Sequence, residues 1–189
     1  MHVSFKENAI NPMTRAYTFR YKEAPVPAQK ENCIESNINK NHPEGFDNVS
    51  FLSKETFAPG TKAALKCAFE GKGCPEIILV EKSELCEDGV VRYGACFEIV
   101  LYKNGVNVWR HFMDENYKCS WHKRVGVDFP VTENEIHTLT VETKENYIIF
   151  SVDGKKTTLR TEDLFSSFHI GLTLCEGVAR AYEMEYEKV

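Results

Sequence analysis

The sequence has no run of basic residues, and this absence bears on its partners. The net charge is −5, and the longest basic runs, Lys123-Arg124 and Lys155-Lys156, contain only two residues. A protein that binds nucleic acid usually presents a basic face that neutralises phosphates. We therefore expect no nucleic-acid partner.

Long apolar runs are also missing. No run approaches the roughly 20 residues that a membrane-spanning helix requires. The N-terminal segment, M-H-V-S-F-K-E-N, lacks the basic start and the apolar centre of a secretion signal. These absences predict no membrane partner and a cytoplasmic location.

The seven cysteines match no C-x-x-C pattern and no zinc-binding spacing. Their odd number and their scatter are typical of free thiols in a reducing compartment. We predict no metal site and no cofactor. One disulfide stays open as an alternative, between Cys67 and Cys74 across a hairpin at residues 71–73.

Helical periodicity is absent, and period-two alternation of apolar and polar residues takes its place from residue 46 onward. Turn signals recur about every 8–12 residues. The clearest is Asn104-Gly105, between alternating runs at 92–102 and 106–113, because Asn-Gly favours a tight hairpin turn. The pattern predicts an all-β fold, a two-sheet antiparallel β-sandwich of jelly-roll type.

The chain is expected to divide into an N-terminal arm, residues 1–45, and a β-sandwich domain, residues 46–189. The arm has too few aliphatic residues for a core of its own. It contains a possible edge strand at 16–21 and an exposed loop at 32–45. The domain is expected to close with two strands, 168–175 and 179–187, joined by a turn at Glu176-Gly177. Alternating glutamates on the last strand indicate a solvated sheet edge.

Four segments together resemble the concanavalin A-like lectin/glucanase superfamily. They are the long hairpin at Asn104-Gly105, I-H-T-L-T-V-E (136–142), Y-I-I-F-S-V-D-G-K (147–155) and F-H-I-G-L-T-L-C-E-G (168–177). The resemblance covers about residues 46–189 and implies two curved sheets, with oligosaccharide bound on the concave face of one of them. Catalytic members of the laminarinase-like branch carry E-x-D-x-x-E or E-x-D-x-E on one strand. No stretch here supplies it, and the nearest, residues 183–187, lacks the aspartate.

The candidate catalytic residues are Glu98, His111 and Glu176. If the Asn-Gly turn is tight, Glu98 and His111 lie on paired strands and near enough to interact. A carboxylate beside a histidine is suited to acid/base chemistry, because each shifts the pKa of the other. The alternative is a cross-strand ion pair on a solvent-facing sheet. For Glu176 the alternative is a bridge to Arg180 across the final turn.

Candidate ligand-binding residues combine aromatic rings, which pack on sugar C–H faces, with polar groups that bond hydroxyls. They come from the central hairpin, from a predicted polar loop at 114–123 and from the final turn. Structural roles stay open for all of them, and His137 and His169 are interpreted as satisfied interior histidines. The candidates are Tyr102, Asn107, Trp109, Tyr117, Trp121, His122 and Arg180.

Three functions remain open from the sequence. The first is a carbohydrate-binding, lectin-like sandwich with an oligosaccharide ligand on the concave face. The second is a glycoside hydrolase or lyase that uses paired carboxylates. The third is a non-catalytic intracellular regulatory module with a protein partner. A groove with an exposed aromatic, a cleft with paired acids, or an apolar surface patch would distinguish them, and we favour a function without catalysis.

Overall fold

The computed structural model describes residues 1–9, 11–37 and 46–188, and these residues form strands and no helix. None of them therefore belongs to a helix that could span a bilayer. The predicted all-β fold is confirmed. In chain order the strands are β1 (His2–Ser4), β2 (Thr14–Thr18), β3 (Ala28–Gln29), β4 (Ile34–Glu35), β5 (Asn48–Leu52), β6 (Thr61–Val80), β7 (Ser83–Leu85), β8 (Val91–Tyr93), β9 (Cys96–Tyr102), β10 (Gly105–Met113), β11 (Cys119–Asp128), β12 (His137–Lys144), β13 (Tyr147–Val152), β14 (Lys155–Arg160) and β15 (His169–Lys188).

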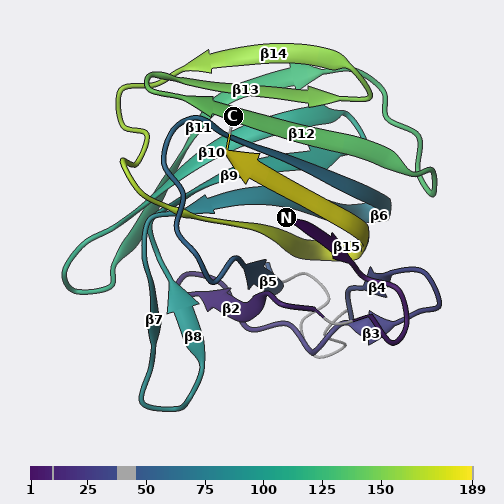
Figure 1. The fold of residues 1–189 in the computed structure, drawn as a ribbon, viewed down its shortest axis with the longest axis horizontal. Coiled ribbons are helices and arrows are strands. Elements are labelled where there is room, and N and C mark those ends of the chain that lie inside the picture. Colours follow the sequence, from purple (N-terminus) through teal and green to yellow (C-terminus); the bar gives the residue numbers. More distant parts are fainter. Residues whose placement is uncertain (10, 38–45, 189) are drawn as a thin grey trace.

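Two long strands, β6 and β15, run antiparallel to each other through the whole molecule and belong to both layers of the sandwich (Figure 1). One half of this pair joins β9, β10 and β11 on one side and β5 and β2 on the other. We call this layer the front sheet. The other half joins β12, β13 and β14 on one side and β1 and β4 on the other. We call this layer the back sheet.

Both long strands change layer at the same place, where glycines relieve a steric conflict. Gly71 has a φ of 59° and Glu176 a φ of 61°, and the β6–β15 register shifts between Glu176 and Val178. A Cβ on Gly73 would lie 1.8 Å from the carbonyl oxygen of Val178. A residue with a side chain would push the two strands apart here, so the crossing requires glycine.

Two turns predicted from the sequence are in fact bends within these continuous strands. Residues 71–73 lie inside β6, and Glu176-Gly177 lies inside β15, which runs unbroken where two strands were predicted. Cys67 and Cys74 therefore lie along one strand and both are free, so the alternative disulfide is wrong. Glycine with a positive φ is typical of a β-bulge as well as of a turn, and the local sequence does not distinguish them.

The predicted solvated edge at the chain's end is also wrong. In the back sheet, β15 lies between β6 and β1, so the strand that carries Glu183 and Glu185 has a partner on each side. Glu183 accepts a hydrogen bond from Lys66 at 2.8 Å. The first residues of the chain pair with this edge of β15. This pairing joins the two ends of the sequence, so the sequence of the last strand alone does not predict it.

The N-terminal arm is attached to both sheets. β2 pairs with β5 in the front sheet, and β1 and β4 pair with β15. Part of the loop expected at 32–45 contains β4, and residues 38–45 of it lie outside the described residues.

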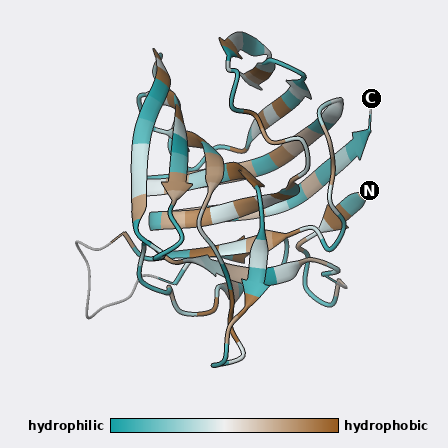
Figure 2. Cartoon of the chain, turned by 90° about the vertical axis from the view of Figure 1, so that its left-hand side faces the viewer, coloured by the Kyte–Doolittle hydropathy of each residue, from teal (hydrophilic) through white to brown (hydrophobic). Residues whose placement is uncertain are grey.

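The core lies between the layers and is built from the alternate residues of each strand that face inward. Figure 2 shows the alternation of apolar and polar positions along the long strands. Buried residues of both sheets join one cluster, which includes Leu65, Phe69, Leu139, Val141 and Phe150 from the back sheet and Ile77, Leu79, Phe97, Ile99 and Leu172 from the front sheet. On each strand of the front sheet, the residues that alternate with these core residues point to the opposite side of the sheet.

His137 of β12 contacts the loop before this strand and the turn after β13 through its two ring nitrogens. Nε2 lies 2.8 Å from the carbonyl oxygen of Thr132, which only accepts, and Nδ1 lies 2.6 Å from Asp153 Oδ2. Burial alone would lower the pKa of His137, but the bonds to Thr132 and Asp153 raise it above its ordinary value. The folded state thus favours the imidazolium.

We expect His137→Gln to reduce the free energy of unfolding by about 1 kcal/mol in mildly acidic buffer. Because the folded pKa is raised, the imidazolium's contribution is complete below the unfolded pKa of about 6.5 and is lost as the pH rises through the folded pKa. Urea denaturation of both proteins across this range measures the difference. His2→Gln, at an exposed ion pair, is the control. If the difference in the free energy of unfolding between the wild type and His137→Gln does not become smaller as the pH rises, the stabilising role of the His137 imidazolium is contradicted.

Candidate functional site

The front sheet has an outer face, which we define as the face turned away from the core. The register of its strands sets the side chains of this face in rows that cross the sheet. Directly opposed side chains in adjacent strands are about 4.5–5.5 Å apart at Cβ, so each row is a line of neighbours. One row contains Ser50, Thr173, Glu76, Val100 and Asn107; the next contains Leu52, Gly171, Ile78, Glu98 and Trp109; the third contains Val80, Cys96, His111 and Trp121.

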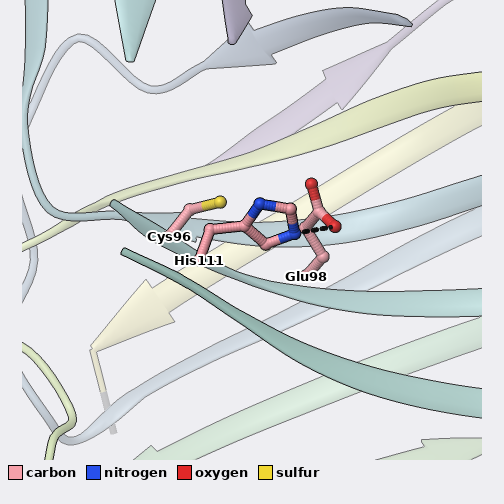
Figure 3. Close-up of side chains that lie close together, drawn as sticks. All are labelled: Cys96, Glu98 and His111. Carbon is pink, nitrogen blue, oxygen red and sulfur yellow. Dashed lines mark ion pairs between the residues drawn. The ribbon is translucent and has the colours of Figure 1, made fainter. Parts of the chain in front are cut away.

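Glu98 and His111 meet on the outer face, as the hairpin at Asn104-Gly105 predicts. Glu98 Oε2 and His111 Nε2 are 2.7 Å apart, and the side chains are 6% and 2% exposed (Figure 3). The pair is therefore buried and does not face solvent. His111 Nδ1 lies 3.4 Å from Nη1 of Arg20, which only donates. Nδ1 then accepts from Arg20, and Nε2–H donates to Glu98.

Glu76 is a site residue that the sequence analysis missed. It is 4% exposed, and its Oε2 has no hydrogen-bond partner. Burial raises the pKa of Glu76 well above its ordinary value, and the charges of Glu98 and Glu176 raise it further. Glu76 follows Pro75 and opens the apolar run 77–80, which is typical of a strand buried on both faces. Strand parity with Ile78 and Val80 is the signal that places it on the outer face.

Several buried polar atoms on and beside this face lack partners in the described part of the chain. They are both amide atoms of Asn48, both carboxylate oxygens of Asp47, Oε2 of Glu76 and Oδ1 of Asn107. Buried polar atoms are nearly always hydrogen-bonded, because an unpaired one costs about 1–3 kcal/mol. Asn48, Glu76 and Asn107 therefore form a hydrogen-bonding surface suited to a polar ligand.

The N-terminal arm covers one end of the outer face. The guanidinium of Arg20 lies 3.1 Å from the ring centroid of Trp121, and Phe19 packs on Tyr117 at 4.8 Å between ring centroids. Trp121 belongs to β11, so the loop predicted at 114–123 is wrong in its second half. Two of the predicted ligand-binding aromatic residues are thus in contact with the chain's own arm.

Tyr21 extends this cover over the acidic residues. Its ring lies 6.1 Å from the ring of His111 and 5.7 Å from that of Phe46, measured between centroids. Burial raises the pKa of Tyr21, and the charge of Glu98 adds to the rise. The arm shares this cover with β8, because a second buried apolar cluster joins Ala16 and Tyr93 to front-sheet residues Leu52, Ile78, Val80 and Cys96.

The remaining candidates separate into those near the acidic residues and those far from them. Trp109 lies directly opposite Glu98, and Tyr102 donates to Asp128 Oδ1 at 3.2 Å. His122 lies opposite Arg110 and packs on Phe112, which places it on the other face of the front sheet. Successive residues of a strand point to opposite faces of the sheet, so His122 and Trp121 cannot share a site.

Arg180 and Glu176 do not form the predicted bridge. Arg180 lies in the back-sheet half of β15 and donates to Glu35 at 2.6 Å, to Asn134 and to Glu70. Glu176 lies at the crossing, and burial raises its pKa while Lys72 opposes the rise. Glu176 thus remains near Glu76 at the end of the outer face, and Arg180 is removed from the site.

Cys96 completes a group that can hold a metal ion. It lies directly opposite His111 in the register, and burial raises the pKa of its thiol well above the ordinary value. Cys96, Glu98 and His111 each offer one ligand atom, and these atoms lie within 4.8 Å of one another. The spacing of cysteines along the sequence does not reveal this group, because it forms across two strands.

The comparisons with known proteins show a likeness of fold and nothing more specific. No family model matches the sequence, and no curated protein matches it. A Bacillus subtilis protein of unknown function with a galectin-like fold has a TM-score of 0.68 at 9% identity, with 100% of this chain and 94% of that chain covered.

Two further solved structures show the same architecture. A legume lectin-like domain from Entamoeba histolytica has a TM-score of 0.59 at 15% identity, covering 99% of this chain and 97% of that one. A β-1,3-1,4-glucanase from a mouse hindgut metagenome has a TM-score of 0.63 at 12% identity, covering 100% and 99%. The chain thus has the concanavalin A-like jelly-roll fold, as the sequence resemblance implies.

We expect the Glu98–His111 pair to be costly to break from one side. His111→Leu leaves a buried carboxylate without its donor and should reduce the free energy of unfolding by about 3 kcal/mol. Adding Glu98→Gln removes that charge, so the double variant should be more stable than the single one. A double-mutant cycle by urea denaturation measures this coupling. A double variant no more stable than His111→Leu would show that the uncompensated carboxylate is not the cause.

Proposed function

We propose that the protein binds an oligosaccharide on the outer face of the front sheet. The observation that carries this proposal is the set of unpartnered polar atoms of Asn48, Glu76 and Asn107. Sugar hydroxyls both donate and accept, so one ligand can satisfy amide and carboxyl groups together. Lectin-like and glucanase structures that share the fold support a carbohydrate-related role, although a shared fold does not by itself define a function.

Aromatic residues on the same face complete the proposed site. Trp109 is half-buried opposite Glu98, and Tyr102 is half-buried near Asn107, so both can pack against the C–H face of a sugar ring. The polar atoms themselves are covered by the arm. The ligand therefore has to displace Tyr21, and the affinity of the wild-type protein is reduced by the fraction of molecules in which the arm is closed.

Binding is favoured over catalysis by the residues on either side of Glu98. On β9 the neighbours on the same face are Cys96 and Val100, so this strand carries a single acidic residue. The paired acids of the laminarinase-like pattern are absent from it. The outer face accordingly offers more groups for recognition than for bond cleavage.

Glycoside cleavage is the second candidate, because Glu76 supplies a second carboxyl from the neighbouring strand. Glu76 and Glu98 are diagonal neighbours across β6 and β9, which corresponds to about 7–8 Å between Cα atoms. The raised pKa of Glu76 suits a general acid, and Glu98 would be the base or nucleophile. Recognition of a protein partner and a cytoplasmic location stay predictions.

A glycan-array screen tests the binding proposal. We expect the wild type to bind a set of oligosaccharides, and Trp109→Ala or Asn107→Ala to weaken binding about tenfold, since each removes one or two contacts worth about 1 kcal/mol. Tyr147→Ala is the matched control, because Tyr147 is an exposed aromatic residue of β13 in the back sheet. Tyr21→Ala should bind more tightly than the wild type. If neither the wild type nor Tyr21→Ala binds any glycan, the proposal is wrong.

Reducing-end release from the glycans that bind tests cleavage separately. If cleavage occurs, Glu76→Gln and Glu98→Gln should each lower kcat by about a hundredfold or more, the range for loss of acid/base catalysis. Glu187→Gln, at an exposed position of β15, should leave kcat unchanged. Binding without any release of reducing ends would exclude cleavage and leave the binding proposal intact.

A further inference from the structure

A second kind of site lies beside the proposed sugar-binding surface, at the third row of the outer face. Cys96 and Glu98 come from β9 and His111 from β10, and Figure 3 shows the three side chains close together, with the imidazole between the other two. Their ligand atoms lie within 4.8 Å of one another, and the residues are 1%, 5% and 2% exposed. We propose that these three residues bind one Zn²⁺ ion, independently of any sugar.

The donor set identifies the metal. A thiolate, an imidazole nitrogen and a carboxylate oxygen are the three ligand types that zinc takes in proteins, and three protein ligands leave a fourth position open. Bond lengths of about 2.0–2.3 Å place tetrahedral ligands roughly 3.3–3.7 Å apart. The group needs to adjust by about 1 Å: the widest separation, up to 4.8 Å, has to contract, and the 2.7 Å between His111 Nε2 and Glu98 Oε2 has to widen. Mg²⁺ and Ca²⁺ prefer oxygen ligands alone and are disfavoured by the sulfur of Cys96.

The charge around the group also calls for a cation. Glu98 and Glu76 are both buried and occupy diagonal positions on adjacent strands, and Oε2 of Glu76 has no partner. Glu98 pairs with His111 and not with Arg20, whose guanidinium contacts His111 Nδ1. A divalent ion bound to Glu98 would stabilise both carboxyl groups.

Zinc binding requires a defined movement of protons. The ion takes the place between His111 Nε2 and Glu98 Oε2 that a proton now occupies, and the ring proton moves to Nδ1. The thiol of Cys96 becomes a thiolate and releases one proton to solvent. Binding is therefore expected to weaken as the pH falls.

Arg20 opposes the ion. Its guanidinium lies 3.4 Å from His111 Nδ1, where a protonated Nδ1 would meet a second donor, and its charge repels the metal. The side chain has to move from His111 before zinc is held. Arg20→Gln should therefore bind zinc more tightly than the wild type, by about tenfold or more, which corresponds to about 1.4 kcal/mol.

Cobalt spectroscopy and calorimetry on the full, metal-free chain test the proposal. We expect one Co²⁺ per chain, with a thiolate-to-cobalt charge-transfer band, and competition by one Zn²⁺ in calorimetry. Cys96→Ser should abolish that band, and His111→Gln should weaken zinc binding by at least about tenfold. Cys119→Ser is the matched control, because Cys119 is a free cysteine outside the group.

A second measurement guards against variants that do not fold. Zinc should raise the Tm of the wild type and of Arg20→Gln, and Mg²⁺ at the same concentration should not, since only a ligand of the folded state stabilises it. The absence of a charge-transfer band in both the wild type and Arg20→Gln would overturn the proposal. So would a folded Cys96→Ser variant that binds zinc as tightly as the wild type.

Discussion

The structure depends on the pairing of β6 with β15 and on the point at which both strands cross between layers. Each strand contributes one half to the front sheet and one half to the back sheet, so the pair holds the two layers together. The crossing is possible because Gly73 lets the backbone of Val178 approach closer than any Cβ would permit. The remaining strands join this pair directly or through a neighbour: β9 and β12 pair with β6, and β1, β4 and β5 pair with β15.

The same pairing assembles the candidate site. β6 carries Glu76 and β9 carries Glu98, and their register makes the two carboxyl groups diagonal neighbours on the outer face. The hairpin from β9 to β10 then brings His111 beside Glu98. Burial raises the pKa of Glu76, and several polar atoms on and beside this face have no partner among the described residues. A polar ligand of the kind proposed above would satisfy these atoms.

The side chain of Arg20 joins the N-terminal arm to two parts of the outer face. Arg20 contacts both Trp121 and His111, so one side chain closes the aromatic end of the outer face and supplies a cation beside the Cys96–Glu98–His111 group. In the two proposals above, residues 19–21 occupy the place that a ligand would take. The free energy of binding would then include the cost of moving Tyr21 for the sugar and Arg20 for the metal ion.

The sequence by itself determined the all-β class, the jelly-roll resemblance and the contact of Glu98 with His111, because alternation and an Asn-Gly turn are local signals that specify register across a hairpin. Only the tertiary structure decided the rest. The tertiary structure made Glu176-Gly177 a bend within β15 and not a turn between two strands. A glycine is compatible with either, and here the pairing of β15 with β6 on both sides of the bend decides between them. The tertiary structure also placed Glu76 beside Glu98, Cys96 opposite His111 and Tyr21 above them. These contacts join residues distant in the chain, and their geometry arises from the packing of whole sheets.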